Sequence, residues 1–370
     1  MKIIKLHIVA FNVPYPADYG GVIDVFYRVK ALSESGVKIH LHCFQYGRKK
    51  SEVLEAICEE VTYYSRSRSL IHQFSYKPFI VQTRSNKMLL KNLLDNDWPI
   101  LFEGLHSCYF LGHPKLKNRI KIVRSHNIEH HYYAGLADKA TSIKDRVFFR
   151  MEALKLKQFE KVLLHANNIA AISEADQYYL HQKYGKTFLM RPSHPSEEVN
   201  IKTGKGNFIL YHGDLSTREN TDAVIFIMRE IAPRLNVQFV IAGKNPTGIL
   251  YQEAKICRNV EIRRNPSHEE MQELISNAHI NLLPTFQATG FKLKLLNAVF
   301  NGRFCMGTPQ LVEGTGLQDV CVIVENASDI IDEIERILTI EFSEEMLVKR
   351  KALLKSYSNS ASISGLLKLI

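Results

Sequence analysis

Two lysines stand where a strand-like run of the sequence gives way to a helix-like one. The run HINLLPT, residues 279–285, has the apolar character of a buried strand, and the segment TGFKLKLLNAVFNG, residues 289–302, has the spacing of a buried helix. A helix beginning near Gly290 would direct unpaired N–H groups and a positive dipole end at the strand. Lys292 and Lys294 would add ammonium groups in the same turn. Together these donors predict a binding site for a diphosphate.

A polar stripe crosses the otherwise apolar helix expected in this segment. Lys294, Asn297 and Asn301 stand at i, i+3 and i+7 and therefore share one face. A structural helix could present such a stripe to solvent, which is the competing interpretation. The position directly after a predicted strand favours a binding function, because ligands of parallel sheets lie outside the carboxyl ends of the strands.

A second glycine-containing loop occurs near the N-terminus. The loop NVPYPADYGG ends in Gly20 and Gly21 and leads into a helical pattern, so it predicts another helix start that accepts an anion. The alternative is a simple glycine turn, but a long loop at a first strand–helix junction is typical of function. The loop lacks GxGxxG and is therefore not a dinucleotide fingerprint.

Two short motifs resemble metal sites. His126, Glu129 and His130 form H-x-x-E-H, which requires one helix that presents both histidines. The preceding run IKIVRS reads as a strand, so His126 is expected at a strand end and no zinc is predicted. Asp95 and Asp97 form a DxD that precedes a strand instead of following one. We interpret it as a loop, and we predict no metal at either motif.

Strand-like and helix-like runs alternate along the chain, which predicts parallel sheets covered by helices on both faces. Residues 192–206, rich in Pro, Ser and Gly, interrupt this alternation and are predicted to link two α/β domains. The strand candidates are IIKLHIVAF, VKIHLHCF, PILFEG, RIKIVRS and NIAAIS in the first half, and NFILYHG, VQFVIAG, VEIRR, HINLLPT, RFCMGT and CVIVE in the second.

The composition agrees with a cytoplasmic protein of two domains. The chain has 370 residues, of which 45% are hydrophobic, enough for two cores. Six cysteines occur without a CxxC pair, which is typical of reduced thiols in a core. No apolar run is long enough to span a bilayer, and the N-terminus lacks a signal-peptide pattern.

The positive charge is concentrated in the first half. Residues 1–195 contain 29 Lys and Arg against 17 Asp and Glu, a balance of +12, and the remainder contains 19 against 21, a balance of −2. Residues 142–166 form a long amphipathic pattern with interspersed lysines. Both features predict contact with an anionic membrane surface, although a solvated basic surface would show the same statistics. Nucleic acid is not an expected partner, because no recognition module is present.

The order of these segments resembles a known family. HGDLSTRENTDAVIFIMREIAPRL, VQFVIAGKNP and TGFKLKLLNAVFNGR, together with FNVPYPADYGG, SHNIEH and AISEADQYYL, resemble retaining glycosyltransferases of the GT-B fold, specifically the family 4-like group. The resemblance covers nearly the whole chain. It implies an α/β protein with two Rossmann-like domains, an interdomain cleft and a C-terminal helix that crosses back. The expected ranges are 1–195 for the acceptor domain, 205–345 for the nucleotide-sugar domain and 346–370 for a helical segment packing on the first domain.

The resemblance also implies an activity. It is the transfer of a sugar from a nucleotide sugar to a glycan or lipid-linked acceptor with retention, in cell-surface polysaccharide or glycoconjugate synthesis. No metal or other cofactor is expected, and the protein is expected at the inner face of the membrane. Lys294 and His126 would be catalytic, with His126 at the acceptor or transferred sugar; a histidine that only ties down a loop is the alternative. The implied donor-site residues are Gly20, Gly21, Gly213, Arg218, Lys244, Arg264, Thr289, Gly290, Phe291, Lys292 and Asn297.

The sequence departs from the family pattern at the donor site. Two glutamates usually stand eight positions apart, and here those positions hold Thr289 and Asn297. Asp214 stands where an arginine is common, and Arg218 follows four residues later. Asn297 could still bond ribose hydroxyls as a neutral amide. These departures leave two alternatives open, a catalytically inactive GT-B partner protein and a nucleotide-sugar epimerase.

Overall fold

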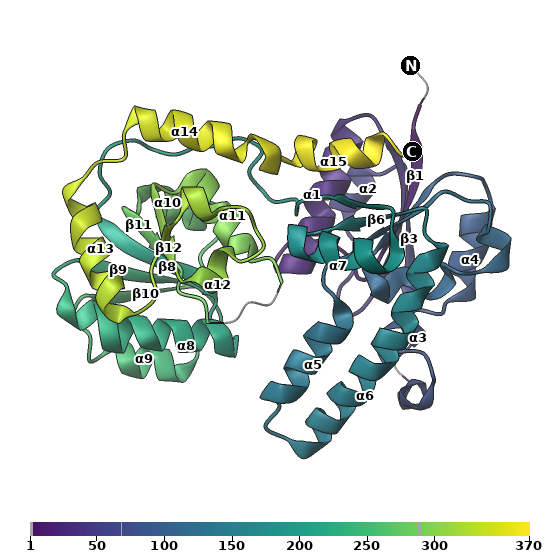
Figure 1. The fold of residues 1–370 in the computed structure, drawn as a ribbon, viewed down its shortest axis with the longest axis horizontal. Coiled ribbons are helices and arrows are strands. Elements are labelled where there is room, and N and C mark those ends of the chain that lie inside the picture. The colour runs from purple at the N-terminus through teal and green to yellow at the C-terminus, as the bar shows by residue number, and fades with distance from the viewer. Residues whose placement is uncertain (1–2, 68, 287–289) are drawn as a thin grey trace. The chain divides into compact units, whose positions relative to one another are not determined.

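The computed structural model describes residues 3–67, 69–286 and 290–370. Internal contacts divide the chain into two compact units, Met1–Ser193 together with Asn359–Ile370, and His194–Ser358. Each unit contains one parallel β-sheet with helices on both faces (Figure 1). The first unit is discontinuous, because its last helix comes from the C-terminal end of the chain.

The first unit is built on a seven-stranded sheet in the order β3-β2-β1-β4-β5-β6-β7. The chain runs outward from β1 to β3 and then returns to the other side of β1 at β4. The carboxyl ends of β1 and β4 therefore form the point where the connections diverge. The strands are β1 (Lys5–Ala10), β2 (Lys38–Gln45), β3 (Glu60–Ser65), β4 (Ile100–Glu103), β5 (Lys121–Arg124), β6 (Asn168–Ala171) and β7 (Thr187–Leu189).

Helices cover both faces of the first sheet because its central strands are apolar on both sides. Leu6 and Ile8 of β1 pack in one core with the flanking helices α1 and α15, while Val9 faces the core on the α4 side. The helices are α1 (Gly20–Glu34), α2 (Glu52–Ile57), α3 (Phe79–Gln82), α4 (Lys87–Leu94), α5 (Glu129–Lys139), α6 (Ile143–Phe159), α7 (Glu174–Tyr184) and α15 (Asn359–Leu367), with the short turns η1 (Leu70–Phe74), η2 (Leu105–Phe110), η3 (Pro114–Leu116) and η4 (Glu160–His165).

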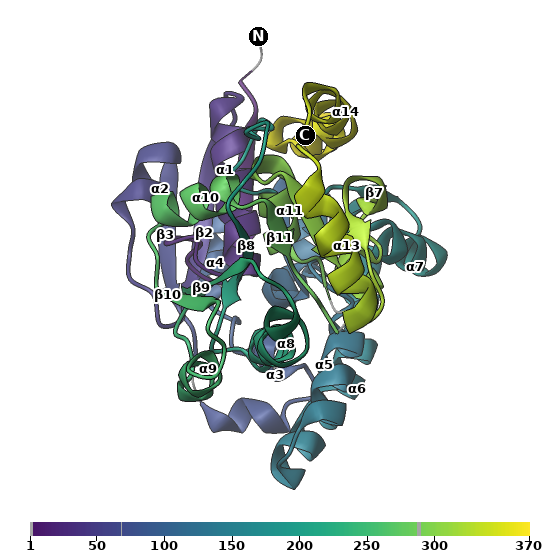
Figure 2. The same ribbon diagram turned by 90° about the vertical axis from the view of Figure 1, so that its left-hand side faces the viewer.

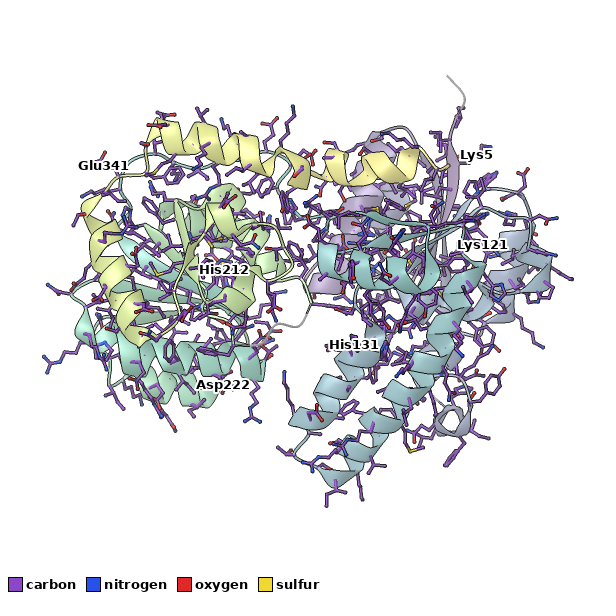
Figure 3. All side chains as sticks on the ribbon, viewed as in Figure 1. Lys5, Lys121, His131, His212, Asp222 and Glu341 are labelled. Carbon is purple, nitrogen blue, oxygen red and sulfur yellow. The ribbon has the colours of Figure 1, made fainter. Side chains whose placement is uncertain are left out.

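The second unit is built on a six-stranded sheet in the order β10-β9-β8-β11-β12-β13. Its central strand β8 is buried along most of its length, and His212 lies inside the unit (Figure 3). The strands are β8 (Phe208–Asp214), β9 (Gln238–Lys244), β10 (Val260–Arg264), β11 (Ile280–Leu282), β12 (Phe304–Gly307) and β13 (Val322–Ile323).

One large core joins the second sheet to its helices, with Ile227, Leu295 and Ile334 buried within it. A π-helical turn, η5, continues α8 without a break. The helices are α8 (Arg218–Phe226), α9 (Gly248–Ala254), α10 (His268–Asn277), α11 (Leu293–Asn301), α12 (Pro309–Val312), α13 (Ala327–Thr339) and α14 (Glu344–Leu354), with the turns η5 (Ile227–Ile231), η6 (Ala232–Arg234), η7 (Gln318–Val320) and η8 (Lys355–Tyr357).

The predicted fold class of two parallel α/β sheets is confirmed. All eleven predicted strands are present, and β3 and β7 are additional strands at the edges of the first sheet. Among the residues that the structure describes, no helix has the length and apolar character needed to cross a membrane.

Candidate functional site

The carboxyl end of the second sheet is organised around β8, which pairs with β9 on one side and with β11 on the other. The connections that leave β8 and β11 therefore run to opposite sides of the sheet. In open parallel sheets, ligands bind at such a point. Two segments meet there, the loop from Asp214 to Thr217 that precedes α8, and the start of α11.

Helix α11 begins later than the sequence predicted. Its first residue is Leu293 and Lys292 is the N-cap, whereas the prediction placed the start near Gly290. Gly290 has a φ of +66°, a left-handed conformation that cannot continue into a right-handed helix. Lys292 is not a free cation, because its Nζ lies 2.7 and 3.0 Å from the two carboxylate oxygens of Glu219 in the first turn of α8.

Lys294 is the second residue of α11, and both of its hydrogen-bond acceptors are neutral. Its Nζ donates to Asn220 Oδ1 at 2.9 Å and to Tyr211 Oη at 3.2 Å, and it lies 4.9 Å from the centroid of the Tyr211 ring. Burial lowers the pKa of Lys294 to about 8; Lys292 acts in the same direction and Glu219 opposes it. An ammonium whose two acceptors are a phenol and an amide can still gain an anionic partner.

Asn220 fixes the position of Lys294, and sequence reasoning did not single it out. Its amide nitrogen donates to the backbone oxygen of Asp214 at 2.9 Å, so its carbonyl oxygen is free to accept from Lys294 and from Tyr211 Oη at 2.8 Å. A Cβ at Gly213 would lie only 3.0 Å from the Asn220 amide. Gly213, a predicted donor-site residue, therefore leaves room for this side chain.

Asn297 and Asn301 form a hydrogen-bonded pair. Asn297 Oδ1 accepts from Gln272 Nε2 at 2.9 Å and from Asn301 Nδ2 at 3.0 Å, and the latter also donates to Ser196 Oγ at 2.8 Å. Asn301 is buried. The polar stripe is thus not a solvated face, and the amide nitrogen of Asn297 is the end that could donate to a ligand.

The remaining predicted donor-site residues of this unit have other surroundings. Arg218 is exposed and lies 3.6 Å from Asp222 on its own helix. Lys244 and Arg264 are exposed at the ends of β9 and β10. Phe291 packs against the core of the second unit, and Thr289 lies outside the described residues.

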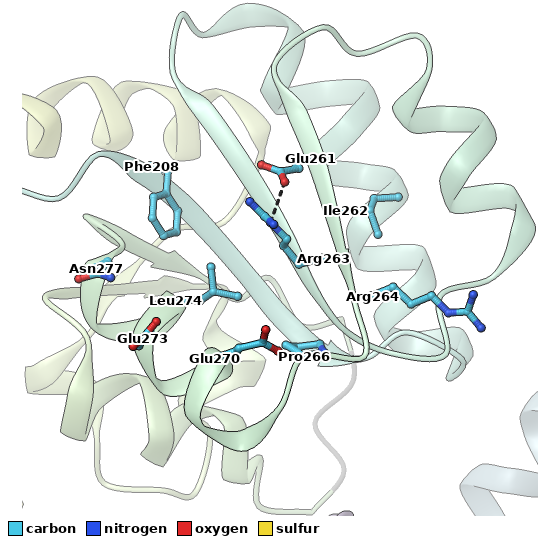
Figure 4. Close-up of a pocket in the computed structure, with 10 residues that line it drawn as sticks. All are labelled: Phe208, Glu261, Ile262, Arg263, Arg264, Pro266, Glu270, Glu273, Leu274 and Asn277. Atoms are coloured by element: carbon cyan, nitrogen blue, oxygen red, sulfur yellow. Dashed lines mark ion pairs between the residues drawn. The ribbon is translucent and has the colours of Figure 1, made fainter.

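A cavity of about 470 Å³ lies along β10, the edge strand of this sheet, beside α10 (Figure 4). Arg263 and Glu261 form an ion pair of 2.6 Å within it, and Arg264 extends away from that pair. Its lining includes Phe208 at the start of β8 and Asn277 at the end of α10. The cavity therefore does not coincide with the point between β8 and β11.

In the first unit, the connections diverge at the carboxyl ends of β1 and β4. A buried network of charged side chains lies beneath this point, and the sequence analysis did not predict it. Arg28 Nη1 donates to both oxygens of Glu103 at 2.6 and 2.9 Å and its other amino nitrogen donates to Asp24, while Arg124 reaches Asp24 at 3.1 Å. Burial alone would raise the pKa of Asp24 and of Glu103, but these guanidinium groups outweigh it and hold both pKa values below their usual range.

His126 closes this network from the loop after β5. Its Nε2 lies 2.8 Å from Glu103 Oε2, and its Nδ1 lies 3.4 Å from Asp24 Oδ2. The imidazole also meets the Phe11 ring edge-on at 5.4 Å and is almost fully buried. Both nitrogens thus face carboxylates, so the side chain is held firmly at the carboxyl ends of β4 and β5.

The half-buried His106 and the buried Glu129 lie beside His126, and each has a buried polar atom without a partner among the described residues, Nδ1 of His106 and Oε1 of Glu129. Their other ends lie 3.6 Å apart. Burial raises the pKa of Glu129 to about 8, and Arg84 only partly opposes this. Buried polar groups are normally hydrogen-bonded, so this pair could bond the hydroxyls of a ligand.

Glycines allow these side chains to approach. Gly104 has a φ of +73°, and a Cβ there would lie 3.0 Å from His106 Nδ1 and 3.4 Å from His126 Cδ2. Gly20 begins α1, as the sequence predicted, and a Cβ on Gly21 would lie 3.0 Å from the Phe11 ring. Their place in a donor site stays a prediction.

The two histidines of the H-x-x-E-H motif do not point at a common site. His126 bonds Glu103, whereas His130 Nδ1 bonds Glu160 Oε2 at 3.0 Å. The two histidines therefore point at different partners, and the absence of zinc at this motif stays a prediction.

No protein-family model matches this chain. A protein of Klebsiella pneumoniae, named an uncharacterized 44.6 kDa protein in the cps region, is 26% identical over 333 residues, which cover 84% of each chain.

Several solved structures share the fold over almost the entire chain. The apo structure of OtsA has a TM-score of 0.67 at 10% identity, covering 99% of both chains. TarM has a TM-score of 0.66 at 12% identity, covering 100% of this chain and 99% of its own. An α,α-trehalose-phosphate synthase (UDP-forming) from Burkholderia xenovorans, in complex with glucose-6-phosphate, has a TM-score of 0.66 at 11% identity, covering 99% of both. The chain therefore has the GT-B fold.

Proposed function

We propose that this protein is a glycosyltransferase that uses a nucleotide sugar. The observation that carries the proposal is Lys294, an ammonium held by neutral partners at the point where the connections of the second sheet diverge. Such a group suits the diphosphate of a nucleotide sugar. The GT-B fold supports the same activity by analogy. The UDP-forming synthase among the structural neighbours makes UDP the first nucleotide to test.

The second unit would bind the donor. The diphosphate would accept from Lys294, with Lys292 shared between Glu219 and the phosphate, and Asn297 Nδ2 would donate to the ribose. As the bond between sugar and phosphate breaks, negative charge grows on the leaving diphosphate. Lys294 would stabilise that charge more strongly in the transition state than in the bound substrate, and this difference accelerates the reaction.

The first unit would bind the acceptor. His106 and Glu129 would bond acceptor hydroxyls, and His126 would hold the loop after β5 in place through Glu103 and Asp24. With retention of configuration, the leaving phosphate can take the proton of the acceptor hydroxyl, so that no separate base and no metal are required for transfer. The relative encoded in a cps region supports a glycan or lipid-linked acceptor in cell-surface polysaccharide synthesis.

A peripheral position on an anionic membrane belongs to this proposal. Helix α6 exposes an apolar stripe of Ile143, Val147, Met151 and Leu154, and η1 exposes Leu70, Ile71 and Phe74. Lysines and arginines flank the stripe. Exposed apolar side chains among basic ones are typical of a surface that binds anionic lipid headgroups.

The test is a thermal-shift screen over nucleoside diphosphates and nucleotide sugars, followed by product analysis with and without acceptors. A ligand that binds only the folded protein raises its melting temperature. We expect one nucleotide to stabilise the protein and its sugar conjugate to be consumed only when an acceptor is present. The absence of any nucleotide shift would contradict the proposal.

A second candidate is a GT-B protein that binds nucleotide without transferring a sugar. Two observations favour it. The pairing of Lys292 with Glu219 reduces the positive charge available to a diphosphate, and Asn297 is neutral where a carboxylate would accept from the ribose hydroxyls. Nucleotide binding without turnover for every donor and acceptor would identify this case, and a changed donor sugar without any acceptor would identify an epimerase.

A further inference from the structure

Three buried histidines converge on one face of the first sheet. His7 lies on β1 and His40 and His42 lie on β2, with His7 directly opposite His40 in the parallel register. Residues two apart on a strand point to the same side, so both histidines of β2 face the same neighbours. One ring nitrogen from each of the three lies within 4.8 Å of the others, and all three side chains are buried.

The facing ring nitrogens of His7 and His42 are almost as far apart as two nitrogen ligands of one metal ion. His7 Nδ1 and His42 Nε2 are 2.9 Å apart, and the rings of His40 and His42 stack at 4.0 Å. A tetrahedral ion with bonds of about 2.0–2.1 Å holds its nitrogens roughly 3.3 Å apart. The two rings would have to separate by only a few tenths of an ångström.

Each imidazole also has an oxygen partner for a second nitrogen. His7 Nε2 lies 2.8 Å from Asn96 Oδ1, His40 Nε2 lies 2.8 Å from Thr62 Oγ1, and His42 Nδ1 lies 2.7 Å from Tyr64 Oη. Histidines that bind metals usually donate their other ring nitrogen to such an oxygen, which orients the ring and fixes its tautomer.

We propose that His7, His40 and His42 bind one divalent transition-metal ion, with Zn²⁺ as the first candidate. Imidazole nitrogens suit zinc, copper and nickel and do not suit magnesium or calcium. Three ligands leave a coordination position for water or for one of the neighbouring oxygens.

A histidine must be neutral to bind a metal ion, and the same is true of the hydrogen-bonded alternative described below. Burial lowers the pKa of His7 to about 4 and lowers those of His40 and His42 as well. All three rings are therefore neutral at pH 7, as ligands must be. For His42, binding requires the tautomer with its proton on Nδ1, which then donates to Tyr64 instead of accepting from it.

The site is separate from the proposed transfer site. His7 pairs in register with Ile100, the first residue of β4, and Asn96 belongs to the loop before that strand. The cluster is thus at the amino ends of the strands, whereas His106 and His126 lie at the carboxyl ends. The ion would brace β1 and β2, and transfer itself would still not need it. Asn96 stands within the DxD motif, but it faces a histidine instead of an ion.

The competing arrangement is a metal-free chain of hydrogen bonds. Tyr64 Oη could donate to His42, His42 to His7, and His7 to Asn96, which would satisfy the rings of His7 and His42. The two arrangements differ in one measurable property, the binding of an ion at stoichiometric concentration.

The experiment titrates the full-length, chelator-treated protein with Co²⁺ and follows the visible absorption of the ion, then displaces it with Zn²⁺. We expect one ion per chain and a higher melting temperature for the loaded protein. His40→Ala should abolish the absorption. Tyr64→Phe should weaken binding about 10–100-fold, because it removes the oxygen partner of His42. Two control variants should bind as the wild type does: Tyr63→Phe, at the residue of β3 that precedes Tyr64, and His181→Ala, at an exposed histidine.

Two results would overturn the inference. One is the absence of Co²⁺ absorption in the folded, chelator-treated protein. The other is wild-type binding in folded His40→Ala, or in Tyr64→Phe where His40→Ala does not fold, which would place the ion elsewhere. Tyr64→Phe keeps the test decisive if His40→Ala does not fold. None of these measurements requires nucleotide or transfer activity, so the outcome is independent of the proposed function.

Discussion

At the scale of single residues, the proposed donor site depends most on Lys294. Lys294→Ala should weaken binding of UDP about tenfold to hundredfold, because a hydrogen bond to a charged group contributes about 1.5–3 kcal/mol. Turnover should fall at least as much, since the charge on the diphosphate grows as the sugar leaves. Asn297→Ala should weaken UDP and the nucleotide sugar equally. Calorimetry on the two variants checks this, and unchanged UDP affinity in Lys294→Ala would return α11 to a purely structural role.

The lowered pKa of Lys294 adds a pH dependence. Its ammonium is present below a pKa of about 8 and is lost as the pH rises through that value. UDP affinity should therefore be highest near neutral pH and decline between about pH 7.5 and 9.5. The dissociation constant, measured across this range in wild type and in Lys294→Met, checks the assignment. A decline of equal size in the variant would assign the titration to another group.

His126 should act in the first unit without affecting the donor. His126→Ala removes the imidazole that bonds Glu103 and faces Asp24, so the loop after β5 loses its anchor. Turnover should fall strongly, while UDP affinity, which the proposed function assigns to the second unit, should stay unchanged. Steady-state kinetics and calorimetry on the folded variant separate the two effects. Wild-type turnover would remove His126 from the site.

At the scale of elements, the hairpin of α5 and α6 allows a direct test of the proposed membrane binding. The two helices lie side by side in both views (Figure 1 and Figure 2), and Lys155 of α6 ties η1 to them through Gln73 O at 2.6 Å. The purified protein should bind anionic vesicles better than neutral ones, and salt should weaken this binding. A Val147→Asp, Leu154→Asp double variant should bind more weakly, because it places acidic side chains on the exposed stripe.

Val348→Asp is the control for the hairpin, because Val348 is at least as exposed as Val147 and Leu154 but lies on α14 of the second unit. Vesicle sedimentation at two salt concentrations measures all three proteins. Equal binding of the wild type to neutral and anionic vesicles, or equal losses in both variants, would contradict a membrane role for α6.

The elements also show how far sequence patterns determine this fold. The central strands were predictable because they are buried on both faces and read as apolar runs. β3 and β7 were not, because β3 has mostly half-exposed residues and β7 has only three. The start of α11 was misplaced because Gly290 was taken as part of the helix, whereas its left-handed backbone precedes it.

The site was predictable only in part. Lys292, Lys294 and His126 follow predicted strands, and their residue types, their positions and the family resemblance singled them out. Asn220, Glu103 and Glu129 gain their roles from contacts between distant segments, such as the 2.8 Å bond that joins His126 to Glu103. His7, His40 and His42 were not singled out from the sequence, because only the register of β1 and β2 brings them together.

At the scale of the whole molecule, the first unit depends on the last residues of the chain. Helix α15 packs against α1, and its Ile363 and Leu366 are buried in the same core as Leu6 and Ile8 of β1. Ser362 Oγ donates to Arg191 O, which fastens the helix near the end of the first polypeptide segment. The unit therefore cannot complete its core until the entire second unit has been synthesised.

Leu366→Ala should destabilise the first unit by about 2–5 kcal/mol, the usual effect of removing a fully buried leucine side chain. Lys368→Ala, at an exposed position two residues later, should leave stability unchanged. Chemical unfolding monitored with and without UDP separates the units, because nucleotide should stabilise only the transition of the second. We expect Leu366→Ala to shift the UDP-insensitive transition alone. A shift of both transitions by the same amount would show that the two units unfold as one, and that the return of α15 couples the donor-binding unit to the core of the other.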